Sequence, residues 1–130
     1  MRDNNPILSI AIPTYNRIEY LNELLDNLLK EISVLQDKTS IELIVSDNAS
    51  TVDVVSVIEK YRLNGLVVKY SRNDVNIGMD GNFHKCFNLA TGRYFWMFGD
   101  DDLIVEGSLK KIIDILKVRK DINIISQIGR

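Results

Sequence analysis

Short apolar runs alternate with helical patterns along the whole chain, and this alternation constrains the possible folds more than any other feature of the sequence. Runs typical of strands lie at 7–12, 41–46, 66–70, 94–98 and 122–125. Between them, apolar residues recur every three or four positions, which predicts helices at 18–35, 54–61, 79–90 and 109–116. Such alternation is typical of βαβ units with right-handed crossovers. The sequence therefore predicts an α/β fold, with a mostly parallel sheet and helices on both faces.

The composition limits the class of protein. The 130 residues fit one domain with a single core, and the hydrophobic fraction of 45% is ordinary for a globular protein. A net charge of −2 gives no electrostatic footprint for nucleic acid. The single cysteine, Cys86, excludes an internal disulfide and fits a reducing compartment. No apolar run approaches the ~20 residues that span a bilayer, and no signal peptide is evident, so a cytoplasmic location is expected.

Three consecutive carboxylates, Asp100, Asp101 and Asp102, follow the apolar run 94–98 directly after Gly99. Adjacent carboxylates at the end of a buried strand repel each other unless a cation compensates their charge. Their hard oxygen atoms suit Mn²⁺ or Mg²⁺, with substrate phosphates completing the coordination shell. Ligands of open parallel sheets bind beyond the carboxyl ends of the strands, where this cluster is expected. The alternative is a solvated acidic turn that caps the next helix.

Polar loops after the first two predicted strands carry residues that suit a nucleotide. Pro13 is expected to end the first strand, because proline cannot donate a hydrogen bond to the sheet. In the loop that follows, Tyr15 could stack on a base and Arg17 could face a phosphate. Asp47 could accept hydrogen bonds from a base or a ribose. The alternatives are that Asp47 caps the following helix and that Tyr15 and Arg17 are ordinary surface residues.

The third loop adds Asn76 and Gly78, which are either ligand contacts or simply a turn. The helix after this loop carries His84, the one histidine of the chain. On a helix near a site, a histidine is more often a packed or solvated residue than a catalytic base. The aromatic run 94–98 is expected to belong to the core.

Four blocks of the sequence, in this order, resemble family 2 glycosyltransferases. The blocks are 12–17 (Ile-Pro-Thr-Tyr-Asn-Arg), 43–51, the Asn76-Ile77-Gly78 turn followed by 89–94, and 98–102. The last block falls where this family has its DxD-type metal motif, and its variant is similar to transferases that build bacterial surface polysaccharides. The resemblance covers nearly the whole chain. It implies the Rossmann-like, nucleotide-binding half of a GT-A fold.

The resemblance also implies roles for individual residues. Asp47 would recognise the base, in a pocket lined by Pro13, Thr14 and Tyr15. Asp100 would contact the ribose, Asp101 would bind the metal ion, and Asp102 is a second candidate ligand. The donor would be a nucleoside-diphosphate sugar, most readily a UDP or dTDP sugar, and the acceptor a glycan or a lipid-linked glycan.

Two positions depart from the family pattern. Gly99 stands where the family usually begins its acidic motif with Asp, which suggests carboxylates shifted by one position. Phe83 and His84 stand where the family often has an Arg-Asn pair, which leaves open any phosphate or sugar role for their helix.

We expect residues 1–130 to form a single nucleotide-sugar-binding domain that stops before the acceptor-binding half. No catalytic base is assigned, because inverting members carry that carboxylate in the second half. The full-length protein is expected in the cytoplasm or at the inner face of the membrane. Two other functions remain open, a metal-dependent phosphotransferase or nucleotidyltransferase and a non-catalytic nucleotide-binding module. A dinucleotide-dependent dehydrogenase is disfavoured, because no Gly-x-Gly-x-x-Gly turn follows the first strand.

Overall fold

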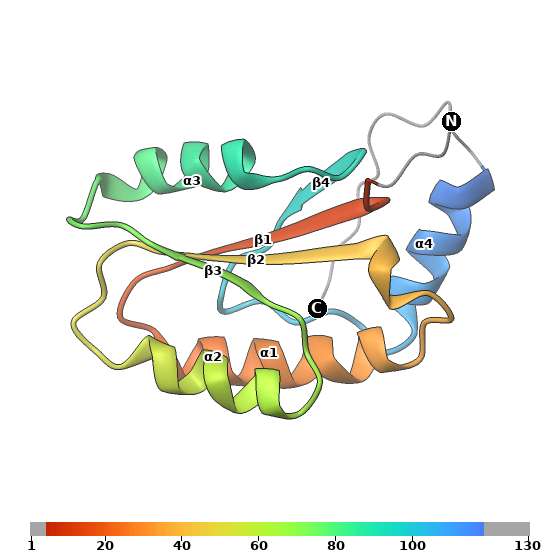
Figure 1. Cartoon of the computed structure of the whole chain (residues 1–130), viewed down its shortest axis with the longest axis horizontal. Helices are drawn as coiled ribbons and strands as arrows, with labels where there is room; N and C mark the ends of the chain where they lie inside the picture. The colour runs from red at the N-terminus through yellow and green to blue at the C-terminus, as the bar shows by residue number, and fades with distance from the viewer. Residues whose placement is uncertain (1–4, 119–130) are drawn as a thin grey trace.

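The computed structural model describes residues 5–118, in which four strands alternate with helices (Figure 1). The strands are β1 (Leu8–Thr14), β2 (Ile41–Asp47), β3 (Lys69–Arg72) and β4 (Tyr94–Met97). The helices are α1 (Ile18–Ser33), the 3₁₀ turn η1 (Lys38–Ser40), α2 (Val54–Leu63), α3 (Gly78–Leu89) and α4 (Ser108–Val118). The strand predicted at 122–125 lies outside the described residues.

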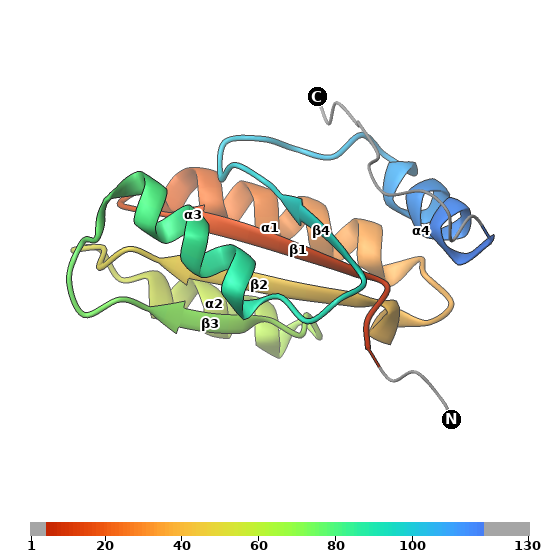
Figure 2. The same cartoon turned by 90° about the horizontal axis from the view of Figure 1, so that it is seen from above.

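All strand pairs are parallel, and the strand order is β3-β2-β1-β4. β1 lies at the centre, and β2 pairs with it over seven residues, from Leu8–Ile41 to Thr14–Asp47. Figures 1 and 2 show α1 and α2 on one face of the sheet and α3 on the other. The predicted α/β class, parallel sheet and two-sided helical cover are confirmed. Because the β1 and β2 ladders end together, the loops after these strands lie side by side.

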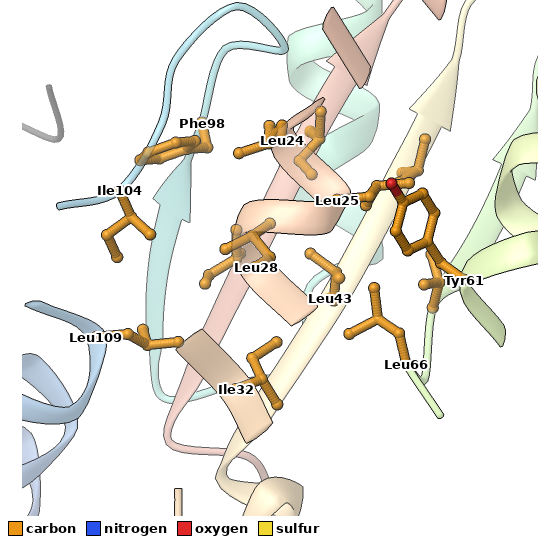
Figure 3. Packing of buried hydrophobic residues seen from close by; sticks show 14 of the residues in the cluster. Leu24, Leu25, Leu28, Ile32, Leu43, Tyr61, Leu66, Phe98, Ile104 and Leu109 are labelled. Atoms are coloured by element: carbon orange, nitrogen blue, oxygen red, sulfur yellow. The ribbon is translucent and has the colours of Figure 1, made fainter. Parts of the chain in front are cut away.

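The main core fills the space between the sheet and the layer of α1, α2 and α4. Figure 3 shows side chains of several elements meeting there, among them Leu28 from α1, Leu43 from β2 and Leu109 from α4. A smaller cluster under α3 joins Ala11, Ile44 and Cys86. Burial raises the pKa of the Cys86 thiol to about 11, so this thiol stays protonated at neutral pH.

Two predicted strands differ from the observed ones. The third strand was expected at 66–70 but pairs over Lys69–Arg72. Leu66 and Val68 are buried as predicted, but the Leu66 N–H donates to Tyr61 O and the Val68 carbonyl accepts from Arg62, so neither group joins the ladder. Proline does not end β1 either. Pro13 lies beyond the last β1–β4 pair and stays opposite Ser46 of β2.

The strand before the carboxylates is less buried than the sequence suggests. All four residues of β4 are half-buried, because β4 is an edge strand in the sheet formed by the described residues. Its side chains still alternate between the two cores. Tyr94 and Trp96 pack against the main cluster, whereas Phe95 and Met97 pack under α3.

The inner face of α3 was predicted only in part. The apolar spacing predicts that Met79, Phe83, Cys86, Phe87 and Ala90 face the sheet, and Cys86 is buried there, but Met79 and Phe87 are 70% and 62% exposed. The residues that α3 buries are Asn82 and Cys86. The helix is rotated in this way because the Asn82 amide bonds to Ser46 of β2, an interaction that an apolar periodicity cannot reveal.

Two side chains of α1, one helical turn apart, brace the segment that follows the acidic cluster. Asn27 makes a reciprocal pair with the backbone of Ile104, its Nδ2 donating at 3.1 Å and its Oδ1 accepting at 2.8 Å. Buried Glu31 accepts from the N–H groups of Gly107 and Leu109 at 3.0 and 3.2 Å, which satisfies the start of α4. The loop leaving the carboxylates is thus fixed to the core helix.

A second polar cluster surrounds Glu42 near the start of β2. Its carboxylate accepts hydrogen bonds from Ser9 Oγ, Lys69 Nζ, and the backbone and hydroxyl groups of Thr91. Burial by itself raises the pKa of Glu42, but the hydrogen bonds from Lys69, Ser9 and Thr91 together outweigh it and lower the pKa to about 2. This ionised carboxylate therefore joins three strands and the segment before β4.

Candidate functional site

A cleft of about 720 Å³ opens at the carboxyl edge of the sheet, between the loop after β1, the start of α3 and the loop after β4. Eight of the ten predicted site residues line it: Pro13, Thr14, Tyr15, Arg17, Asn76, Gly78, Asp100 and Asp101. Another cleft, of about 640 Å³ between α1 and α2, contains none of the predicted site residues. The structure thus gathers residues from three separate loops around one cavity.

A hydrogen bond ties the end of β1 to the acidic loop. Thr14 Oγ1 donates to Asp100 Oδ2 at 2.9 Å, and both residues are buried. Burial raises the pKa of Asp100, while the Thr14 hydrogen bond and the Arg17 charge oppose this effect and the Asp101 charge adds to it. Asp100 is therefore a carboxylate whose orientation is fixed and whose second oxygen faces the cleft side occupied by Arg17.

Arg17, at the entrance to α1, is the cation nearest to this carboxylate pair. Its Nη1 lies 3.5 Å from Asp101 Oδ2 and 4.0 Å from Asp100 Oδ1. The guanidinium also lies over the ring of Tyr20, 5.5 Å from its centroid. Half of the Arg17 side chain is exposed, so its exposed pair with Asp101 contributes little to stability and leaves Arg17 able to turn toward an anion in the cleft.

The donor atoms fit a small divalent cation that is completed by substrate oxygens. Asp101 Oδ1 and Asp102 Oδ2 each lie 3.1 Å from the point that a Cβ on Gly99 would occupy. The missing side chain of Gly99 therefore leaves a space that both carboxylates face. Within residues 5–118, no group of three or more acidic, histidine or cysteine side chains forms a complete metal cage. Mg²⁺ needs only one or two carboxylates plus phosphates, so this pair suffices.

Asp47 lies behind the cleft and not on its surface. The side chain is 1% exposed, and both oxygens have partners: Ser50 N donates to Oδ1 at 3.0 Å and Tyr70 OH donates to Oδ2 at 2.7 Å. The predicted alternative, a cap of the next helix, is wrong, because Asp53 caps α2 by accepting from Ser56 N. Direct contact between Asp47 and a base stays a prediction.

The sequence reasoning missed a network of buried amides that shapes the wall of the cleft. Asn73 Nδ2 donates to Asn48 and Asn82, and Asn48 in turn donates to Asn76 Oδ1 and the Gly78 carbonyl. The Ile77 N–H donates to Asn48 Oδ1. These bonds fix the turn before α3, where Gly78 has a positive φ of 84°. Asn76 and Gly78 are therefore both a turn and part of the cleft.

The loops after β1 and β2 are also bonded to each other. The Asn16 N–H donates to Ser50 Oγ at 2.9 Å, and Asn16 Oδ1 accepts from the Thr51 N–H at 2.8 Å. Asn16 and Ala49 both have positive φ, 51° and 65°, and Ala rarely adopts this region. The hydrogen bonds between the loops hold this strained conformation, so the two loops are fixed relative to each other before any ligand arrives.

The remaining lining residues were not predicted as site residues: Asn48, Met79, Asn82, Phe83, Met97 and Gly99. His84 is exposed and does not belong to the lining. Asp102 is likewise not a lining residue, although its carboxylate faces Gly99 beside that of Asp101. No sequence signal marked Met79, Phe83 or Met97 as site residues, because apolar residues on helices and strands are usually core.

Residues 9–130 match the family described as Glycosyl transferase family 2. The chain belongs to this family. The fold agrees, since the four-stranded parallel sheet with helices on both faces is the Rossmann-like half expected of a GT-A fold. The family 2 chain carries its acidic cluster and polar loops at the edge of the sheet where the cleft opens.

Relatives of this family 2 chain include bacterial polysaccharide transferases. The abequosyltransferase RfbV of Salmonella typhimurium is 41% identical over 117 residues, which are 89% of this chain and 34% of RfbV. The poly(ribitol-phosphate) β-N-acetylglucosaminyltransferase TarS of Staphylococcus aureus is 36% identical over 105 residues, or 78% of this chain and 17% of TarS. The chain therefore spans about a third of the length of RfbV and less of TarS.

Two solved structures resemble the family 2 chain. TarS 1–349 in complex with UDP-GlcNAc has a TM-score of 0.73 and 31% identity, over 85% of this chain and 31% of that one. The mannosyltransferase PcManGT of Pyrobaculum calidifontis has a TM-score of 0.69 at 23% identity over 87% of this chain and 32% of that one, which supports the fold alone. Among the described helices, none is both long and apolar enough to cross a bilayer.

Proposed function

We propose that this chain binds the nucleoside-diphosphate sugar donor of a glycosyltransferase that builds a surface polysaccharide. The observation that carries the proposal is the joining of Thr14, Arg17, Asp100 and Asp101 around one cleft at the carboxyl edge of a parallel sheet. Two further findings support it: the family match over residues 9–130 and the similarity to TarS, whose structure holds UDP-GlcNAc.

Each end of the donor has a matching group in the cleft. We assign the ribose hydroxyls to Asp100, whose carboxylate is held by Thr14, and a face of the base to Tyr15, which is 43% exposed beside Pro13. Arg17 would turn from Asp101 to the diphosphate, because a phosphate offers it two acceptor oxygens in place of one weak ion pair. Asp47 would either contact the base itself or fix the depth of the base pocket through its hydrogen bonds with Ser50 and Tyr70.

Asp101 and Asp102 would hold Mn²⁺ or Mg²⁺ beside Gly99. Such a cation, when bound, supplies a Lewis acid that stabilises the departing nucleoside diphosphate. The protein residues supply position: the Thr14 bond fixes Asp100, and Asn27 and Glu31 fix the segment after Asp102. A negatively charged cluster held in place in this way attracts a cation without reorganising.

We extend the proposal to inverting transfer onto a glycan or lipid-linked acceptor in the cytoplasm or at the inner membrane face. Among the described residues, the carboxylates at the cleft are assigned to the donor and its cation, and His84 lies away from it. We therefore expect the general base and the acceptor site to come from outside residues 5–118, and these residues alone should not transfer sugar.

Calorimetric titration tests the donor proposal. UDP, dTDP, GDP and CDP are titrated into the protein with and without Mn²⁺, and ATP serves as the comparison. Binding of a diphosphate that Mn²⁺ strengthens at least tenfold is the expected result. Equal affinities with and without the metal, or a clear preference for the triphosphate, would contradict it. The second outcome would favour a nucleotidyltransferase or phosphotransferase.

A further inference from the structure

One wall of the donor cleft is formed by apolar side chains. It consists of Met79 and Phe83, one turn apart on the same side of α3, and Met97 at the end of β4. None of the three side chains has a strong hydrogen-bonding group. Thr14, Arg17 and the carboxylates line the same cavity, so it presents both apolar and charged groups to a ligand.

The polar residue within the apolar wall is already engaged. Asn82 lies between Met79 and Phe83 along α3 and is 3% exposed. Its Oδ1 accepts from Ser46 Oγ and Asn73 Nδ2, and its Nδ2 donates to the Ser46 carbonyl. The amide therefore has little capacity left for a ligand hydroxyl, and the wall remains apolar in its chemistry as well as in its composition.

The position of this wall relative to Asp101 indicates which part of the donor meets it. If Asp100 holds the ribose and the cation on Asp101 holds the diphosphate, the sugar is bonded to the phosphate next to Asp101, within about one ring of it. Met97 precedes Asp101 by four residues and lines the same cavity, as do Phe83 and Met79. Thr14, Arg17 and the carboxylates are assigned to the ribose, the cation and the diphosphate. The amides of Asn48 and Asn82, which also line the cavity, are bonded within the protein, so we assign the apolar wall to the sugar.

A hydroxyl placed against such a wall loses water and gains no partner, whereas a methyl or methylene group gains burial. We propose that the donor sugar is a deoxyhexose whose deoxygenated carbon contacts Met79, Phe83 and Met97. This inference rests on the proposed function and names the class of sugar that the site takes. A hydrophobic pocket discriminates against one added hydroxyl by about ten- to a hundredfold, which sets the size of the expected preference.

The test compares two donors that differ in one hydroxyl, the D-glucose and 6-deoxy-D-glucose derivatives of whichever nucleoside diphosphate binds best in the presence of Mn²⁺. Calorimetry should give a Kd at least tenfold lower for the deoxy donor. In Met79→Gln and Phe83→Gln, which add a hydrogen-bonding amide to the wall, this ratio should fall toward one. Met79 is 70% exposed, so Met79→Gln keeps the test valid even if Phe83→Gln folds poorly.

Phe87→Gln is the matched control, because Phe87 lies one turn further along α3, 62% exposed and against Phe95, and does not line the cleft. It should keep the full preference. Equal affinities for the two donors, or tighter binding of glucose, would overturn the inference while leaving the donor proposal intact. A loss of affinity for the bare diphosphate in both wall variants would assign the wall to the nucleotide and would also overturn it. Absence of any diphosphate binding would overturn the proposed function and this inference together.

Discussion

Thr14 and Asp100 are 86 positions apart in the sequence and are joined by a hydrogen bond of 2.9 Å between their side chains. This bond is the direct link between the central strand and the acidic loop. Both residues line the cleft, and Arg17 Nη1 lies 4.0 Å from the other oxygen of Asp100. The hydroxyl group of Thr14 therefore helps to orient the carboxylate assigned to the ribose.

Replacing Thr14 by Val should weaken nucleotide binding at least about tenfold, since a hydrogen bond to a charged carboxylate contributes about 1.5–3 kcal/mol. The Thr14 bond opposes the burial that raises the pKa of Asp100, so its loss should raise that pKa further. As the pH is lowered, the nucleotide affinity of the variant should consequently begin to fall at a higher pH than that of the parent. Thr14→Ser keeps the hydroxyl and should bind like the parent in titrations between pH 5 and 8.

Asp101→Asn should abolish the enhancement of nucleotide binding by Mn²⁺ and leave the metal-free affinity within about threefold. The amide keeps the size of the carboxylate but lacks the charge that a hard cation requires. Asp114→Asn, on α4 and paired with Lys110, is the control for a general loss of negative charge. If Asp101→Asn keeps the full effect of Mn²⁺ on nucleotide affinity, Asp101 is not a metal ligand.

Tyr70→Phe distinguishes the two proposed roles of Asp47. The substitution frees Asp47 Oδ2 from the Tyr70 hydroxyl but keeps the ring that packs against the core. If Asp47 contacts the base directly, nucleotide affinity should stay or rise in Tyr70→Phe and fall about ten- to a hundredfold in Asp47→Ala. If both variants lose thermal stability and neither changes nucleotide affinity, the role of Asp47 is only to hold the loop after β2.

Glu42 should make the protein lose stability in acid. Its pKa falls from 4.5 in the unfolded chain to about 2 in the fold, so it contributes about 3 kcal/mol of stability above pH 4.5. That contribution is lost as the pH falls toward 2, because the folded state must then take up the proton. Urea unfolding at pH 7 and pH 3 should show a large destabilisation by Glu42→Gln at pH 7 that shrinks at pH 3.

Glu59→Gln provides the comparison for this measurement, because Glu59 is exposed and paired with Arg62 on the surface of α2. Its effect should stay below about 1 kcal/mol at both pH values. An equal effect of Glu42→Gln at pH 7 and pH 3 would show that the carboxylate does not carry the acid sensitivity.

The sequence predicted the features that depend on local patterns. The alternating apolar runs predicted the helices, the strands and the parallel sheet. The polar loops at the strand ends predicted eight of the residues that line the cleft. The start of β3 and the inner face of α3 could not be predicted in this way. Both depend on hydrogen bonds from side chains to the backbone, from Arg62 to the Val68 carbonyl and from Asn82 to the Ser46 carbonyl, which leave no periodicity in the sequence.

The burial of Asp47 escaped prediction for a related reason. A carboxylate after a strand is usually exposed, and here it is covered because Tyr70 of β3 and Ser50 both bond to it. The apolar wall was missed because Met79 and Phe83 suggested a helix packed on the sheet. Which side of a helix faces the sheet depends on all its contacts, and α3 has a buried amide among them.

The bracing of the acidic segment by Asn27 and Glu31 has a consequence for folding. The amides of Ile104 and Leu109 are bonded to side chains of α1, the helix that provides much of the main core. These amides can exchange with solvent only when α1 releases them. In native-state hydrogen exchange they should therefore show protection close to that of the core strands, and the carboxylate loop should unfold in the same cooperative unit as α1.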